Sequence, residues 1–176
     1  MKKHLIIITA MVGITASVFG QGQVTLANNA ATLITSSGAP VAIGSTTFQL
    51  MAGAAANSLT PLTPTAGVNA AAAGRIANTI INVPSAPNGQ TAFFQILAWA
   101  SSFGTYQQAL SGGGMVGQSS VFTSATSLQN PGDPIPTPVS LAGKYSAFSL
   151  APVPEPSTIA LGILGAGSLL FLRRKK

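Results

Sequence analysis

The chain has no cysteine, and it carries very few of the side chains that perform acid–base or metal chemistry. Its one histidine is His4, and its two acidic residues are Asp133 and Glu155. Without thiolates, the chain forms neither disulfides nor a structural thiolate metal site. General acid–base catalysis, a Ser-His-Asp arrangement and a pair of glycosidase carboxylates all need groups that this chain lacks. We therefore expect no catalytic residue, no metal site and no cofactor.

The basic residues do not form a nucleic-acid site either. Six of the eight Lys and Arg residues lie within the first three or the last four positions of the chain. The other two, Arg75 and Lys144, are balanced by Asp133 and Glu155. A neutral body has no basic stripe to neutralise phosphates, so we exclude nucleic acid as a partner. A serine–lysine nucleophile using Lys144 stays formally open, but a single lysine beside an edge strand more often protects that edge.

Residues 1–20 have the three-part pattern of a secretory signal peptide. Two lysines precede an apolar run from Leu5 to Phe19, and Val18 and Gly20 stand at positions −3 and −1 of a cut between Gly20 and Gln21. Ala16 offers a second cleavage position. The alternatives are a retained membrane anchor and a buried strand. A spanning helix needs about 20 apolar residues, and this run is shorter. We therefore favour a signal peptide that is removed.

The other end of the chain reads as a membrane helix. Residues 157–172 carry no charge and would form about 24 Å of helix, close to the thickness of a hydrocarbon core. Pro156 precedes this run and Ser157 is suited to be its N-cap. Four basic residues follow and act as a membrane stop: Arg173, Arg174, Lys175 and Lys176. By the positive-inside rule they stay cytoplasmic, which places the body on the far side of the membrane. A buried core helix would explain the apolar run but not the adjoining charges.

The last 24 residues resemble a known sorting signal. The sequence Val153-Pro154-Glu155-Pro156-Ser157, followed by an apolar helix and a basic end, is similar to the PEP-CTERM protein-sorting domain. The resemblance implies recognition by an exosortase, a multi-pass membrane cysteine protease of Gram-negative bacteria that make exopolysaccharide. It also implies a cut near residues 154–156. Before this cut, the precursor would sit in the inner membrane with its body in the periplasm. After the cut, the body would be delivered to the cell surface or to an extracellular matrix such as a biofilm.

The Pro-Glu-Pro triplet has a physical rationale of its own. Prolines at positions 152, 154 and 156 hold the chain extended, because each ring fixes φ and disfavours helix in the preceding residue. Glu155 then presents one negative charge on a stiff segment, which suits a protease that needs an extended substrate. The alternative is a rigid spacer with an incidental glutamate.

The body, residues 21–150, reads as an all-β domain. Short runs of β-branched and aromatic residues alternate with Gly-, Pro- and Asn-rich turns. The expected strands are 24–26, 48–50, 76–83, 92–99, 121–123 and 145–150. This pattern predicts a single β-sandwich of an Ig-like or jelly-roll-like kind, flanked by the signal peptide and the transmembrane helix. Residues 91–99 are apolar on both alternating faces, which predicts a strand covered on both sides. One helical turn is expected at 105–110, and a stiff proline loop at 130–138.

Three parts follow from this reading: a signal peptide (1–20), an exported β-rich domain (21–150) and a sorting signal (151–176). The order of motifs in the body also resembles a recurrent type of PEP-CTERM protein, which implies no known activity. We expect a non-catalytic surface or matrix protein. The alternative is a glycan-binding or adhesion module that contacts exopolysaccharide. Its sugar platform would be formed by Phe93, Phe94, Trp99, Phe103 and Tyr106.

Overall fold

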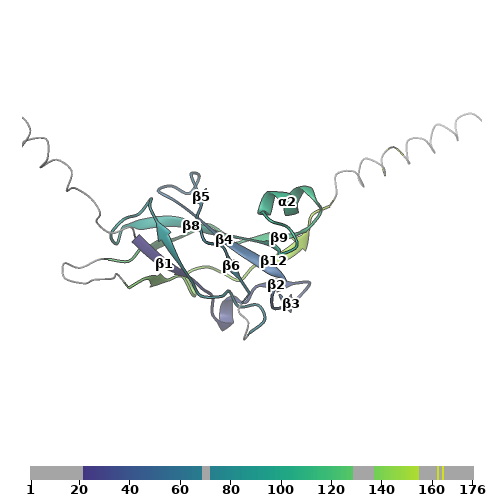
Figure 1. Ribbon diagram of the computed structural model, residues 1–176, viewed down its shortest axis with the longest axis horizontal. Helices are drawn as coiled ribbons and strands as arrows, with labels where there is room; N and C mark the ends of the chain where they lie inside the picture. The colour runs from purple at the N-terminus through teal and green to yellow at the C-terminus, as the bar shows by residue number, and fades with distance from the viewer. Residues whose placement is uncertain (1–21, 69–71, 129–136, 155–161, 163, 165–176) are drawn as a thin grey trace, which may run out of the picture.

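The computed structural model describes residues 22–68, 72–128 and 137–154, together with residues 162 and 164. These residues form mainly β-strands arranged in two sheets, with the 3-10 helix η2 (Ala30–Thr32) and the short α-helix α2 (Tyr106–Ser111) between them in sequence (Figure 1). The all-β prediction is confirmed. Among the residues that are described, no helix has the length and apolar character to cross a bilayer. The expected signal peptide and nearly all of the expected helix 157–172 lie outside them.

The smaller sheet has three strands in the order β11-β1-β7. Its members are β11 (Val139–Ser140), β1 (Gly22–Leu26) and β7 (Thr79–Val83). β1 is antiparallel to β7 and parallel to β11. The expected strand 76–83 therefore begins three residues later than the sequence indicated, and Ile76 instead forms an isolated bridge with Val68.

The larger sheet follows the order β3-β2-β12-β9-β8-β4-β5, with β10 also paired to β8 and β6 to β4. Its long strands are β4 (Thr46–Gly53) and β8 (Thr91–Ala100). Its four-residue strands are β9 (Met115–Gln118), β10 (Phe122–Ala125) and β12 (Ser149–Pro152). Its two-residue strands are β2 (Thr35–Ser36), β3 (Ala39–Pro40), β5 (Thr60–Pro61) and β6 (Ala66–Gly67).

The hydrophobic core contains side chains of both sheets. The alternate residues Ala92, Phe94, Ile96 and Ala98 of β8 are buried, and they belong to one cluster with residues of β1 and β7. From the smaller sheet this cluster includes Val24, Leu26, Ile81 and Val83. Each large side chain buried in this way stabilises the fold by about 1.5 to 3 kcal/mol. In a chain without disulfides, this burial and the backbone hydrogen bonds hold the two sheets together.

The second face of β8 is buried at one end and half-buried along most of the rest, so the prediction of a strand covered on both sides holds only in part. Phe93 and Leu97 are half-buried, whereas Trp99 is buried. The cover over Trp99 is α2: the Trp99 and Tyr106 rings meet edge to face with centroids 6.2 Å apart. The Trp99 indole N–H also donates to the carbonyl of Phe103, at 2.9 Å.

Helix α2 confirms the helical turn predicted at 105–110. Thr105 is its N-cap, and its hydroxyl accepts a hydrogen bond from the backbone N–H of Gln108. The Gln108 side chain in return accepts one from the N–H of Thr105, completing a capping box. A helix this short is marginal by itself, so the cap and the packing on Trp99 stabilise it.

Asn28 joins two segments of the chain with its buried side chain. Its amide donates to the carbonyls of Thr32 and Gly74, both at 2.8 Å, and its amide oxygen accepts from the N–H of Ile76 at 2.9 Å. The guanidinium of Arg75 donates to the Asn28 backbone carbonyl at 3.3 Å. One neutral side chain thus ties the segment after β1 to the turn before β7.

Tyr145 makes a second long-range bond between neutral groups. Its hydroxyl donates to the buried carbonyl of Ala27 at 2.9 Å, and its ring lies 5.3 Å from that of Phe122. It belongs to the expected strand 145–150, of which only residues 149 and 150 lie in a strand, β12. Burial raises the pKa of the Tyr145 phenol well above that of a free tyrosine.

We predict that the free energy of unfolding falls in alkaline solution. The phenol of Tyr145 ionises near pH 10 in the unfolded chain but stays neutral in the folded one, because burial raises its pKa. The stability that this group contributes is therefore complete below about pH 10. It is lost above that pH at about 1.4 kcal/mol per pH unit. Urea unfolding followed by Trp99 fluorescence at about pH 8 and about pH 11 measures the effect.

The matched variant is Tyr145→Phe, which keeps the ring and removes the ionisable group. It leaves the Ala27 carbonyl without this donor, so we expect a loss of about 1 to 3 kcal/mol at pH 8. We expect a smaller further loss at pH 11 than in the parent protein. Burial also raises the pKa of Tyr106, and this group contributes equally to the alkaline loss of stability in the parent protein and in the variant. Equal alkaline losses in the two proteins would contradict the assignment to Tyr145.

Candidate processing site at the end of the last strand

Strand β12 carries the chain to the start of the predicted sorting motif. It lies between two strands that are distant in sequence: Ser149 and Leu150 pair with β2 in parallel, and Ala151 and Pro152 pair with β9 in antiparallel. Figure 1 shows β2, β3, β9, β12 and α2 at the same end of the molecule. The segment that precedes the motif is thus an inner strand of the larger sheet, and it extends two residues past position 150.

The first residues of the motif continue this pairing. The N–H of Val153 donates to the carbonyl of Gly114 at 3.1 Å, and Val153 is half-buried. Alternate residues of a strand point their N–H groups to opposite sides. The N–H of Val153 points toward β9, so an N–H at position 152, which proline lacks, would point away from β9. On that side β2 pairs only with Ser149 and Leu150, so a proline there breaks no hydrogen bond. Pro154 is exposed.

The Gly114 carbonyl, which accepts the hydrogen bond from the Val153 N–H, belongs to a run of three glycines, residues 112–114. The Phe103 ring packs against this run, and a Cβ built on Gly114 would lie 2.5 Å from a carbon of that ring. The N–H of Gly114 donates to the carbonyl of Ala109 at the end of α2, at 2.8 Å. The glycines therefore let Phe103 and α2 approach the start of β9 closely. Sequence reasoning took this region for a loop and missed β9.

A second close approach lies further along β9. A Cβ on Gly117 would lie 2.7 Å from the carbonyl oxygen of Ser149 and 3.3 Å from Cα of Leu150. Only a glycine lets β12 pass at this distance. The sequence signal that could have indicated the strand is Met115-Val116 directly after the glycines, a short apolar pair that is too brief to identify alone.

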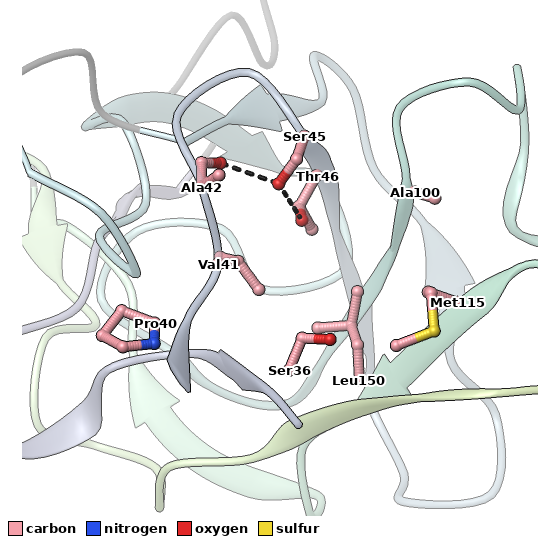
Figure 2. A pocket seen from close by; sticks show the side chains of 9 residues that line it. All are labelled: Ser36, Pro40, Val41, Ala42, Ser45, Thr46, Ala100, Met115 and Leu150. Carbon is pink, nitrogen blue, oxygen red and sulfur yellow. Dashed lines mark hydrogen bonds between the residues drawn. The ribbon is translucent and has the colours of Figure 1, made fainter. Parts of the chain in front are cut away.

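A cavity of about 290 Å³ borders β12 and β9. Figure 2 shows the side chains of Val41, Met115 and Leu150 directed toward the same space. The Ser45 hydroxyl is used within its own turn, donating to the carbonyl of Ala42 at 2.7 Å. The full lining is Ser36, Pro40, Val41, Ala42, Ser45, Thr46, Ala100, Met115 and Leu150. These side chains are hydroxyl, aliphatic or thioether groups, so the cavity offers uncharged contacts.

The other predicted site residues fall outside the described part of the chain. They are Glu155, Pro156 and Ser157 of the motif, Arg173, Arg174, Lys175 and Lys176 of the membrane stop, and Gly20 and Gln21 at the signal cut. Asp133 and most of the proline loop at 130–138 lie outside it too. Lys144 is exposed in the turn after β11.

The five aromatic residues of the expected glycan platform do not form one exposed surface. Phe94 is in the core, where its ring stacks on Phe122 at 5.8 Å, and Trp99 is buried beneath α2. Phe93, Phe103 and Tyr106 are half-buried. The ring of Phe103 packs against the glycine run at residues 112–114. Partial burial of Tyr106 raises the pKa of its phenol.

A family model described as the PEP-CTERM protein-sorting motif matches residues 152–176. The chain carries a PEP-CTERM sorting motif. The match begins at Pro152, the last residue of β12, so the motif begins where the larger sheet ends. Such a signal directs export and sorting to the cell surface through exosortase-related processing. No curated protein and no solved structure matches the chain.

We predict that Gly117→Ala loosens the attachment of β12. The new methyl group would meet the Ser149 backbone at 2.7 Å, so the strands must separate. We expect limited proteolysis of the segment before the motif to become faster, and the free energy of unfolding to fall by about 1 to 3 kcal/mol. Mass spectrometry of the proteolytic fragments locates the cuts.

The matched control is Gly67→Ala, also in a strand of the larger sheet. A Cβ there has no atom within 4 Å, so cleavage near the motif should stay at the parental rate. Equal cleavage rates in the two variants would contradict the role given to Gly117.

Proposed function

We propose that this PEP-CTERM protein is a non-catalytic structural component of the cell surface or extracellular matrix. In the precursor, residues 157–172 hold it in the inner membrane, with Arg173 to Lys176 cytoplasmic and the body periplasmic. An exosortase then cuts near residues 154–156. The observation that carries this proposal is the position of β12: the motif begins where the sheet ends.

The geometry of β12 makes a cut at residues 154–156 compatible with a stable product. The strand pairings of the segment end at Pro152, and its last described backbone hydrogen bond is made by the N–H of Val153. A cut after Pro154 therefore keeps all of these bonds. A cut before Ser149 would remove β12 from between β2 and β9, leaving unpaired groups on both.

The finer features of the precursor belong to the same proposal. The signal peptide 1–20 would be removed between Gly20 and Gln21, which is one residue before β1 begins. The two sheets, which share one core, support a β-sandwich of Ig-like or jelly-roll-like kind for the body. Both processing positions would then flank the sandwich with almost no linker.

The charged side chains of the described body support a structural role. Arg75 donates to the backbone carbonyl of Asn28, and Lys144 is exposed in a turn. Arg75 thus helps to hold the fold together, and Lys144 contacts solvent.

Exopolysaccharide binding is the second candidate function. The outer face of β8 and β4 places the half-buried Phe93 and Leu97 near Gln49 and Gln95, a mixture of ring and amide groups that suits a sugar. Against it, the amide N–H groups of Gln49 and Gln95 already donate to backbone carbonyls, at 3.4 and 3.0 Å. Pull-down with exopolysaccharide distinguishes the two functions, because binding that Phe93→Ala abolishes would favour the second.

We predict that Glu155 is needed for processing. Glu155→Ala removes the one carboxylate of the motif, so we expect the uncut precursor to accumulate and the shorter product to decrease at least about tenfold. Immunoblotting of envelope and medium fractions, with intact-mass measurement of the product, reports both the amount and the cut position.

The matched control is Glu155→Gln, which keeps the size and polarity of the side chain without its charge. If charge is recognised, this variant should fail as well. Normal processing of both variants would remove Glu155 from the recognition step, and a soluble cytosolic precursor with both ends intact would overturn the topology.

A further inference from the structure

Strand β7 is the edge of the smaller sheet and pairs on one side only, with β1. It has five residues, Thr79–Val83. The other strands at open edges of the described sheets are shorter: β10 has four residues, and β3, β5, β6 and β11 have two each. β7 therefore presents the longest unpaired edge among the residues that the structure describes.

The backbone groups that face outward on β7 are those of Ile80 and Asn82. The carbonyls of Gln23 and Thr25 in β1 accept hydrogen bonds from Ser127 and Leu141, on the side away from β7. Val24 must then direct its backbone groups toward β7, where it pairs with Ile81. Because residues alternate in an antiparallel ladder, the N–H and C=O groups of Ile80 and Asn82 point to the open side.

This edge lacks the protection that natural sheets use. Residues 79–83 read Thr-Ile-Ile-Asn-Val, with no charge and no proline, and the β1–β7 register has no bulge. Ile80 is 56% exposed. Open edges are normally kept short or given lysines, prolines or bulges, because a regular uncharged edge is a template for another strand.

We propose that β7 is a self-association edge, which pairs antiparallel with β7 of a second copy of this chain. About a two-fold axis at Ile81, Ile80 of one copy lies opposite Asn82 of the second copy, and Asn82 opposite its Ile80. These are the residues whose backbone groups face outward, so both pairs become hydrogen-bonded pairs. The two small sheets join into one continuous sheet.

A second copy fits this edge better than a charged partner would. Between residues 22 and 154 the chain carries only Arg75, Lys144 and Asp133 as charged residues, so two copies approach without strong repulsion. The sequence around the axis is also self-complementary, since Ile81 faces Ile81 on the core side. An isologous two-fold contact of this kind closes on itself and leads to a dimer rather than a fibre.

The first experiment measures the mass of the full-length chain in detergent by sedimentation equilibrium over a range of concentrations. We expect a dimer for the parent protein and a monomer for Ile80→Pro, because proline removes an outward N–H that makes no bond within the sheet. Ile80→Lys is a second variant, with at least about tenfold weaker association. A monomeric parent protein, or a dimer that persists in both variants, overturns the proposal.

The matched control is Ile43→Lys, which changes a similarly exposed isoleucine (54%) in the turn before β4. It should remain a dimer. Trp99 fluorescence verifies that each variant is folded. A loss of dimer in the control as well would assign association to general surface hydrophobicity and overturn the role of β7.

The second experiment tests the register and exploits the absence of cysteine. Two single variants, Ile80→Cys and Asn82→Cys, are mixed and treated with a short thiol-reactive linker. We expect the mixed pair to cross-link several-fold faster than either variant alone, because residue 80 of one copy lies opposite residue 82 of the second copy. Equal or absent cross-linking in all three samples overturns the register, whatever the result of processing assays.

Discussion

The larger sheet depends on the insertion of β12 between β2 and β9. Without this strand, the β2–β3 hairpin has no partner in the sheet and β9 becomes an edge. The insertion depends in turn on close approach at Gly117 and on the hydrogen bond from Val153 to Gly114. The glycine run, Phe103 and α2 are all arranged around this contact, so the last strand of the body is fixed by residues about 30 to 50 positions before it.

Neutral side chains perform the long-range bonding that ion pairs perform in more charged proteins. Asn28 ties the segment after β1 to Gly74 and Ile76, and Tyr145 ties the chain before β12 to Ala27. Such groups are costly to bury unless they are satisfied, and in the described part of the chain no buried side-chain polar atom lacks a partner. These bonds join neutral groups, so screening by salt weakens them less than it would weaken surface ion pairs.

The sequence predicted the elements that are long or have clear local signals. β1, β4, β8 and β10 were recognised from β-branched and aromatic runs, and α2 was expected as one helical turn at 105–110. The two-residue strands and β9 were missed because their pairing is decided by distant partners, not by their own composition. The cover of β8 was overestimated because Phe93 and Leu97 have apolar side chains but are only half-buried, whereas Trp99 is buried against Tyr106 of α2. The sorting motif was recognised from sequence alone, whereas its attachment to the sheet required the fold.

The placement of β12 links completion of the larger sheet to synthesis of nearly the whole body. The segments for β2 and β9 are made long before residues 149–153, so the sheet stays open until the last strand is present. A molecule terminated before Ser149 would retain unpaired strand edges on β2 and β9, and such edges are templates for aggregation. Closure of the sheet thus separates chains that reach the start of the sorting motif from shorter ones.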